Sequence, residues 1–309
     1  MTAMRDEISA FLKTFQPRVA GRNGSYYLEI DRFATIPWHP PMKGRLFQNK
    51  PNTELYEETT TGLVAFLLDH FDIRTFFDAG AASGYFSRLC LTYLPRAIDV
   101  HAFEMQPSLT PKLDAIMAEW AKDGRSGKAY CAGLSDSDRG TSHVWYSVTK
   151  LYETKPEEND YRDSVWRRIK FALKGRRNRD ELKEADIEIT SIDAFSKREN
   201  VVPDLIKIDV DGHEGPVLKG GRETFATHFP FVVLELHKDR MLAKTGMNRR
   251  DAVKVLFDAG YQALFVNDHH DLETTLSDVG EGDAAFDRQK TDQFLFWHPK
   301  TLERLGRRN

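Results

Sequence analysis

Residues 75–86 read T-F-F-D-A-G-A-A-S-G-Y-F. Two phenylalanines lead into Asp78, which we expect to end a short buried strand. Gly80 and Gly84 enclose a turn of small residues, where glycine lets the backbone turn sharply and approach a ligand closely. From Tyr85 onward the apolar residues recur at helical spacing. The stretch therefore predicts a strand, a glycine-rich turn and a helix, the first βα unit of a nucleotide-binding α/β sheet.

The spacing of the two glycines separates two classes of cofactor-binding fold. The stretch has the form D-x-G-x-x-x-G, whereas the dinucleotide fingerprint is G-x-G-x-x-G. It resembles motif I of the class I S-adenosylmethionine (SAM) methyltransferases. The spacing therefore disfavours a NAD-dependent oxidoreductase, and a tight turn without any ligand is the plain alternative.

An acidic residue stands at the distance from the turn that a bound ribose requires. Residues 97–103 are expected to form the second strand, and Glu104 follows it. In Rossmann-like sheets an acidic residue about 20 positions beyond the glycine turn accepts hydrogen bonds from ribose hydroxyls. Residues 128–134 are the expected third strand, and the polar loop after it begins with Ser135 and Asp136. In a SAM-binding fold this loop borders the adenine ring.

The most specific stretch lies further along the chain. Residues 203–221 read P-D-L-I-K-I-D-V-D-G-H-E-G-P-V-L-K-G-G, and a second buried strand is expected at 231–236, with E-L-H at its end (residues 235–237). These segments resemble the FkbM family of SAM-dependent methyltransferases. So do A-F-E-M-Q-P at residues 102–107 and T-S-I-D-A-F at 190–195. The resemblance covers roughly residues 55–299.

The resemblance implies a fold, a cofactor and a reaction. The fold is a Rossmann-like α/β class I methyltransferase with a seven-stranded, mostly parallel sheet. Its last two strands, expected at 261–266 and 293–297, form a reversed hairpin joined by a long polar linker that we expect to be mobile. The reaction is methyl transfer from SAM to a hydroxyl of a sugar, a glycolipid or a secondary metabolite; a catalytically inactive SAM-fold binding module is the alternative. The residues expected to bind SAM are Asp78, Gly80, Ala81, Gly84, Glu104, Met105, Ser135 and Asp136.

Charged residues gather at the ends of the fourth and fifth expected strands. The acceptor hydroxyl must lose its proton, which suits a histidine or a carboxylate. His237 is the expected base, with Asp209 as its positioning partner, because imidazole titrates near neutral pH. His213 is the competing base, although the family often has a small residue there and usually Glu in place of Asp211. In a further alternative Asp209, Glu235 and His237 bind Mg²⁺, unless Glu235 points into the core.

An N-terminal arm, residues 1–54, precedes the shared pattern. It begins with a short amphipathic helix expected over residues 5–15. Prolines around Trp38 and His39 predict irregular structure there, and ordinary packing of these two side chains is favoured over a substrate role.

The methyltransferase domain spans residues 55–309 and contains an insertion at about 145–186. Within it, residues 167–179 form an expected helix with a basic side and no acidic residue. One interpretation is a solvated helix whose positive charge is compensated by the acidic residues that follow it. The other is a lid that favours an anionic acceptor, or a surface that meets membrane phospholipid.

The composition narrows the function classes and the compartment. A net charge of −3 argues against bulk nucleic-acid binding, and two cysteines exclude a disulfide framework. No apolar run approaches the ~18 residues of a membrane span, and the N-terminus lacks a signal-peptide core. We therefore expect a cytoplasmic enzyme with a small-molecule or glycan acceptor and no transmembrane segment. Membrane-surface contact and a homo-oligomer stay open.

Overall fold

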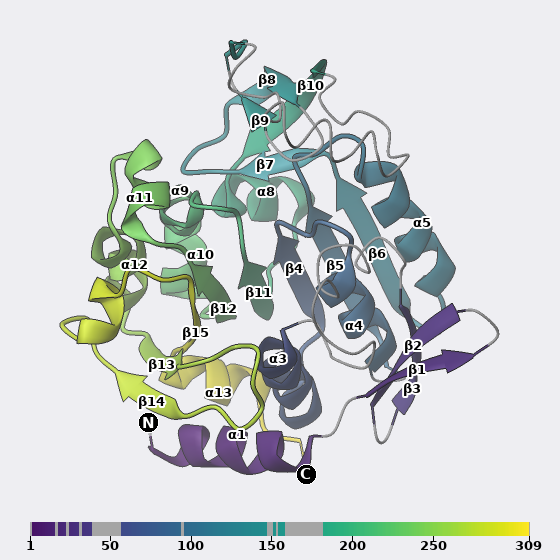
Figure 1. Ribbon diagram of the computed structural model, residues 1–309, viewed down its shortest axis with the longest axis vertical. Helices are drawn as coiled ribbons and strands as arrows, with labels where there is room; N and C mark the ends of the chain where they lie inside the picture. The colour runs from purple at the N-terminus through teal and green to yellow at the C-terminus, as the bar shows by residue number, and fades with distance from the viewer. Residues whose placement is uncertain are drawn as a thin grey trace, which may run out of the picture.

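The chain folds around a central sheet of eight strands (Figure 1). The computed structural model describes residues 2–15, 18–22, 25–30, 33–38, 57–93, 96–146, 151–152, 154–157 and 182–308. In spatial order the strands are β14 (Leu276–Val279), β13 (Gln262–Val266), β15 (Asp292–Trp297), β12 (Phe231–Leu236), β11 (Leu205–Ile208), β4 (Thr75–Ala79), β5 (Ile98–Phe103) and β6 (Arg125–Tyr130).

The strand order confirms the predicted Rossmann-like sheet. The five strands from β12 to β6 run parallel, and β15 is antiparallel to both β12 and β13. The chain order reverses at β4, which lies between β5 and β11, and such a switch point is where open α/β sheets bind ligands. Beyond the seven strands expected, β14 pairs with the edge of β13. The linker expected to be mobile therefore contains a strand, and also the 3-10 helix η3 (Ala284–Asp287).

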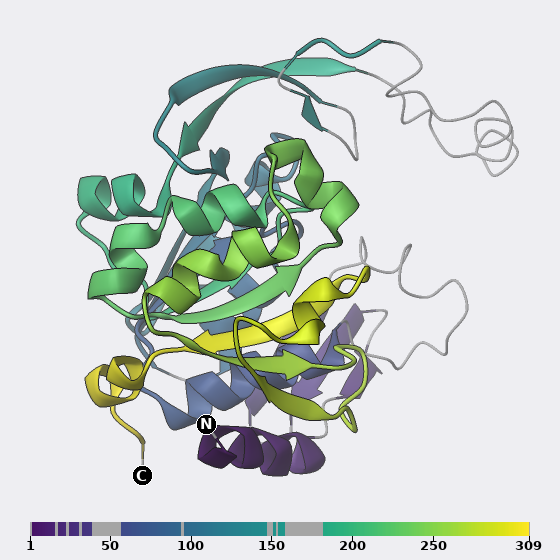
Figure 2. The same ribbon diagram turned by 90° about the vertical axis from the view of Figure 1, so that its left-hand side faces the viewer.

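Helices cover both faces of this sheet (Figures 1 and 2). Strand residues alternate between two apolar layers: Phe76 and Leu205 face one layer, and Phe77 and Ile206 face the other. Strands buried on both faces read as continuous apolar runs, as these do. The first layer holds α3 (Glu58–His70), α4 (Tyr85–Tyr93) and α5 (Thr110–Trp120). The second holds α8 (Ile192–Glu199), α9 (Glu214–Lys219), α10 (Arg222–Thr227), α11 (Asp239–Leu242) and α12 (Arg249–Asp258).

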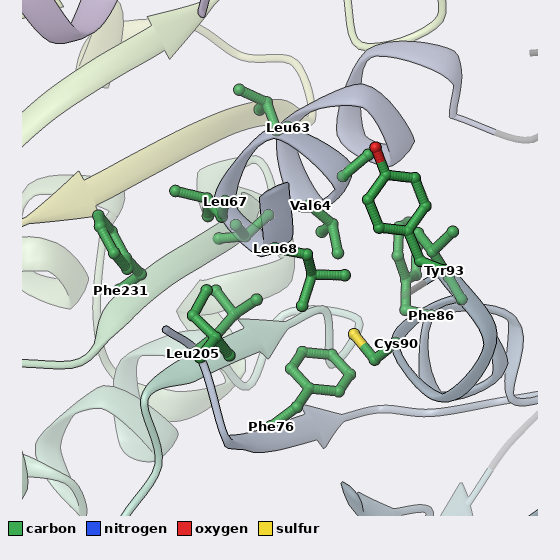
Figure 3. Close-up of a cluster of buried hydrophobic side chains, with 14 of the residues drawn as sticks. Leu63, Val64, Leu67, Leu68, Phe76, Phe86, Cys90, Tyr93, Leu205 and Phe231 are labelled. Carbon is green, nitrogen blue, oxygen red and sulfur yellow. The ribbon is translucent and has the colours of Figure 1, made fainter. Parts of the chain in front are cut away.

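The first layer is packed by large side chains from three strands and two helices. Phe76, Leu205 and Phe231 meet Leu67 and Cys90 in one cluster (Figure 3). All five are at most 2% exposed. Burial of a large apolar side chain stabilises a fold by roughly 1.5–3 kcal/mol, so this cluster fixes α3 and α4 on the sheet.

The N-terminal arm consists of a helix and a small sheet. Helix α1 (Thr2–Thr14) confirms the amphipathic helix and contacts α3 and β14 (Figure 2). Strands β1 (Arg18–Arg22), β2 (Ser25–Ile30) and β3 (Phe33–Trp38) pair antiparallel. The irregular structure expected around Trp38 is therefore wrong, since β3 ends there. Pro37 is tolerated because β3 is an edge strand, where a missing N–H does not break the sheet. His39 lies outside the described residues.

A second sheet begins at the carboxyl end of β6. Its order is β7 (Ala132–Leu134), β10 (Lys183–Thr190), β8 (Gly140–Tyr146) and β9 (Leu151–Tyr152). The predicted third strand is thus two strands, β6 and β7, separated by Cys131. The expected limits of the insertion, at about 145 and 186, fall inside β8 and β10. Alternation with a period of two residues in β10 buries Ile187 and Ile189, while Glu184 and Asp186 are exposed. The basic run at 167–179 lies outside the described residues.

The described residues include no helix long and apolar enough to cross a membrane. Helix α13 (Pro299–Leu305) follows β15.

Candidate active site

The turn after β4 has the backbone shape that its sequence predicts. Gly80 and Gly84 have φ angles of +80° and +76°, in the left-handed region that favours glycine. The N–H groups of Gly80 and Ala81 both donate to the carbonyl of Phe103, at 3.0 Å each, which ties the turn to the end of β5. A Cβ added at Gly80 would lie 1.8 Å from the carbonyl oxygen of Asp209. The turn therefore also contacts the residue that follows β11.

Asp78 is buried next to this turn and fixes the start of α4. Its Oδ2 accepts hydrogen bonds from the N–H and the hydroxyl of Ser87, at 3.0 and 2.6 Å. Burial raises the pKa of the Asp78 carboxyl. Its Oδ1 is buried and has no hydrogen-bond partner among the described residues. Asp78 thus positions the helix that follows the turn, and its contact with SAM stays a prediction.

Glu104 lies beside the turn, directly after β5. Its two carboxylate oxygens accept hydrogen bonds from the N–H groups of Ala82, at 2.8 Å, and Gln106, at 2.7 Å. Burial raises the pKa of Glu104. Since each carboxylate oxygen has a second lone pair, a carboxylate held in this way can still accept hydroxyl hydrogen bonds. The next residue, Met105, is half-buried and packs on the apolar cluster of the second sheet.

The loop after β7 connects the cofactor side to the segment after β11. Ser135 is buried, and its hydroxyl lies 3.0 Å from Nε2 of His213. Asp136 accepts hydrogen bonds from Arg139, at 3.2 Å, and Lys219, at 3.3 Å. Partial burial acts to raise the pKa of Asp136, but the hydrogen bonds outweigh it and lower that pKa. Two expected SAM-binding residues and the competing base His213 are therefore brought together.

Three side chains meet at the carboxyl ends of β11 and β12. One ligand atom from each of Asp209, Glu235 and His237 lies within 4.8 Å of the other two. We call these three residues the strand-end triad. Lys207 is buried in β11, with its Nζ 3.1 Å from Oδ2 of Asp209. Burial, then the charges of Asp209 and Glu57, raise the pKa of Glu235 to about 8. Glu235 thus faces the triad rather than the apolar core.

The ring of His237 is oriented by Glu214, not by Asp209 as expected. Nδ1 of His237 lies 2.8 Å from Oε1 of Glu214, which also accepts a hydrogen bond from the N–H of Gly212 at 2.9 Å. Glu214 is fully buried at the start of α9 and needs such partners, whereas Asp209 pairs with Lys207. Burial acts to lower the pKa of His237, but the hydrogen bond and charge of Glu214 raise it to about 9.

Two further residues of this edge were not found from the sequence. Glu57, the residue before α3, is buried and acts electrostatically on Glu235 and Lys207. His269 follows β13, and its carbonyl accepts the N–H of Thr59 at 3.0 Å. Neither lies in a motif, and both reach the edge through long-range contacts. No local sequence signal could have identified them.

The comparisons with known proteins place this geometry in a family. The family model described as the methyltransferase FkbM domain matches residues 78–281, which include the glycine turn, the second sheet and the strand-end triad. No curated protein matches the chain.

Three solved structures resemble parts of the chain. A methyltransferase FkbM from Methylobacillus flagellatus KT is 15% identical with a TM-score of 0.40, over 74% of this chain and 44% of that one. This chain therefore spans less than half of that protein's length. A precorrin-6y C5,15-methyltransferase from Geobacter metallireducens GS-15 is 12% identical, with a TM-score of 0.37, over 77% of this chain and 87% of that one. Aeropyrum pernix fibrillarin, solved with natively bound SAM, is 12% identical, with a TM-score of 0.36, over 90% of this chain and 97% of that one.

Proposed function

Because the chain belongs to the FkbM methyltransferase family, we propose that it transfers a methyl group from SAM to a hydroxyl oxygen of a small-molecule or glycan acceptor. The observation that supports this most is the contact of the glycine turn with the end of β11. A Cβ on Gly80 would touch the Asp209 carbonyl. The expected SAM-binding turn therefore lies beside the carboxylates and imidazole that a hydroxyl acceptor needs.

The residues of the turn fit the cofactor. The turn has no side chain at Gly80 and Gly84, and Glu104 is held by two backbone N–H groups where ribose hydroxyls can be bound. SAM supplies a methyl group already activated on a sulfonium. The protein's task is then to hold the acceptor oxygen in line with that methyl group, which can lower the barrier by several kcal/mol, on the order of 7 or more in good geometry.

The proton of the acceptor hydroxyl needs a group to receive it, and His237 is the proposed base. Glu214 holds Nδ1, so that Nε2 faces Asp211 and Glu235 at 3.6 and 4.0 Å. With a pKa of about 9, the ring must lose its own proton before it can act. The proposed alternative is a divalent cation at the strand-end triad, for which the sequence alone suggested Mg²⁺ and which would supply Lewis acidity. The basic run at 167–179 supports the proposal of an anionic acceptor.

Calorimetric titration with SAM tests the cofactor site. Replacing Glu104 by Ala should weaken SAM binding by about 1.5–3 kcal/mol, because charge-assisted hydrogen bonds to the ribose are lost. Glu104→Gln keeps one oxygen as acceptor for the backbone and should give a smaller loss. Asp114→Asn, on the exposed side of α5, removes a carboxylate away from the turn and is the matched control.

Titration with NAD, together with an assay for S-adenosylhomocysteine, separates the alternative functions. An NAD-dependent oxidoreductase would bind NAD, and an inactive binding module would bind SAM but release no S-adenosylhomocysteine with any hydroxyl acceptor. Equal SAM affinity for the parent protein and Glu104→Ala would refute the proposed ribose contact.

A further inference from the structure

We propose that the strand-end triad is a binding site for a divalent first-row transition-metal ion, Mn²⁺ or Zn²⁺, rather than for Mg²⁺. This inference rests on the proposed function only for its purpose, which would be to lower the pKa of a coordinated acceptor hydroxyl. In this arrangement Nε2 of His237 binds the ion, and the ion takes the place of His237 as the group that activates the hydroxyl. The donor atoms of Asp209, Glu235 and His237 all lie within 4.8 Å of one another. Two ligand atoms of one ion, with bonds of about 2.1 Å, lie roughly 3–4 Å apart. A rotation of the side chains therefore brings the three donor atoms to coordination distance.

The imidazole supplies evidence for a ligand that the carboxylates alone would not. His237 is 6% exposed, and Glu214 binds its Nδ1 at 2.8 Å. Among the described residues its Nε2 makes no hydrogen bond; the carboxylate oxygens of Asp211 and Glu235 lie 3.6 and 4.0 Å from it. A buried imidazole with a carboxylate behind one nitrogen and the other directed at acidic side chains is the arrangement in which proteins orient a metal-binding histidine.

The surrounding charge favours a cation at this point. Glu57 and Glu214 are buried close to the triad, and both act on its members electrostatically. Lys207 pairs with Oδ2 of Asp209 and offsets the charge of that carboxylate. The carboxylates of Glu57, Glu214 and Glu235 are left to attract an added cation.

The donor set selects the kind of ion. Carboxylate oxygens alone suit Mg²⁺, which demands octahedral geometry and keeps several waters. An imidazole nitrogen is a borderline donor that favours ions later in the first transition row, while two carboxylates keep Mn²⁺ competitive. The triad therefore should bind Zn²⁺ most tightly, then Mn²⁺, and Mg²⁺ most weakly.

The test is metal binding by the full chain after treatment with a chelator, without acceptor or turnover. Calorimetry with ZnCl₂, MnCl₂ or MgCl₂ gives the three affinities, and loss of the electron paramagnetic resonance signal of free Mn²⁺ gives an independent value. Glu235→Gln keeps the side-chain shape and should weaken Mn²⁺ binding at least tenfold. His237→Asn should reduce the ratio of Zn²⁺ to Mg²⁺ affinity at least tenfold, because it removes the nitrogen donor. Asp114→Asn is the matched control, since its carboxylate is exposed on α5 and outside the triad.

The outcomes separate this inference from the proposed function. SAM affinity measured on each variant reports whether the fold is intact, so a folding failure is not counted as lost metal binding. If the parent chain binds SAM but neither Mn²⁺ nor Zn²⁺, or if Glu235→Gln and Asp114→Asn bind Mn²⁺ equally, the metal site is overturned and the methyltransferase proposal stands. If the metal binds as expected and SAM does not, the site is supported and the proposed function fails.

Discussion

Gly80 is the residue at which one added methyl group should disturb both halves of the site. Its φ of +80° is costly for an L-amino acid, and its Cβ would lie 1.8 Å from a backbone oxygen. Gly140 offers the matched control, because its φ is +64° and a Cβ there would meet nothing within 4 Å. Both substitutions by Ala should lose about 1–2 kcal/mol from the left-handed backbone.

The clash should appear as the difference between these two variants. Since the Asp209 carbonyl belongs to the backbone and cannot swing away, Gly80→Ala should lower the free energy of unfolding by about 1–3 kcal/mol more than Gly140→Ala. Urea unfolding of the two proteins measures this difference. Equal losses would show that the turn and the end of β11 are not in contact.

The sequence predicts individual residues well where backbone shape dictates them. Gly80, Gly84 and Glu104 stand where their spacing placed them, because a glycine turn and a strand end are local features. Contacts between residues that are distant in the sequence are predicted less well. The role of Glu214 in orienting His237 depends on how α9 meets β12. Asp209 was predicted as the partner of His237 only because it lies in the same motif region. Glu57 reaches the site from a segment that shares no pattern with it.

Helix α13 begins at a histidine cap, His298, which we expect to be sensitive to pH. Nδ1 of His298 accepts the N–H of Lys300 at 3.0 Å, and the ring stacks on Phe229. Burial, with the charge of Lys300, lowers the pKa of His298. Below the unfolded pKa of about 6.5 the unfolded chain therefore takes up this proton more readily than the folded one. The stabilisation by this cap should be complete above pH 6.5 and lost as the pH falls through the folded pKa.

Replacing His298 by Asn tests this cap, since asparagine caps helices but does not titrate. Urea unfolding between pH 7.5 and about 5 should show a smaller loss of stability on acidification in His298→Asn than in the parent, by up to about 1 kcal/mol. Identical pH slopes in the two proteins would contradict a neutral, hydrogen-bonding His298.

Elements with strong local signals were predicted closely, and those that depend on pairing were not. Strand β12 and helix α12 follow the apolar pattern, and Gly260 ends α12 with φ of +88°, as a C-terminal glycine cap should. The hydrogen bonds from Gly260 and Tyr261 back to Phe257 and Leu256 complete that cap. The second sheet was missed because β8 and β10 are distant in sequence, and only their pairing gives the alternating residues one buried face.

At the scale of the molecule, the sequence predicts the Rossmann-like sheet and its reversed edge but not how the arm joins it. Helix α3 is buried almost all round, which a pattern of apolar residues on one stripe does not indicate. The reason is α1, whose Ile8 and Leu12 cover the outer side of α3. Helix α1 is therefore part of the core.

The docking of α1 predicts a specific coupling between two positions. A Cβ added at Gly62 in α3 would lie 2.4 Å from Cδ2 of Leu12. Gly62→Ala alone should therefore gain about 1 kcal/mol of helix propensity and lose about 1–3 kcal/mol to overpacking. Leu12→Ala alone should cost about 2–5 kcal/mol, because a fully packed leucine is removed.

In the double variant the clash is absent and the new methyl group partly fills the space that Leu12 leaves. It should therefore be more stable than Leu12→Ala, with a coupling energy of about 1 kcal/mol or more in the double-mutant cycle. The control cycle pairs Gly62→Ala with Lys13→Ala, whose side chain on α1 is exposed, and should be additive within about 0.5 kcal/mol. Additivity in the Leu12 cycle as well would mean that α1 does not pack on α3.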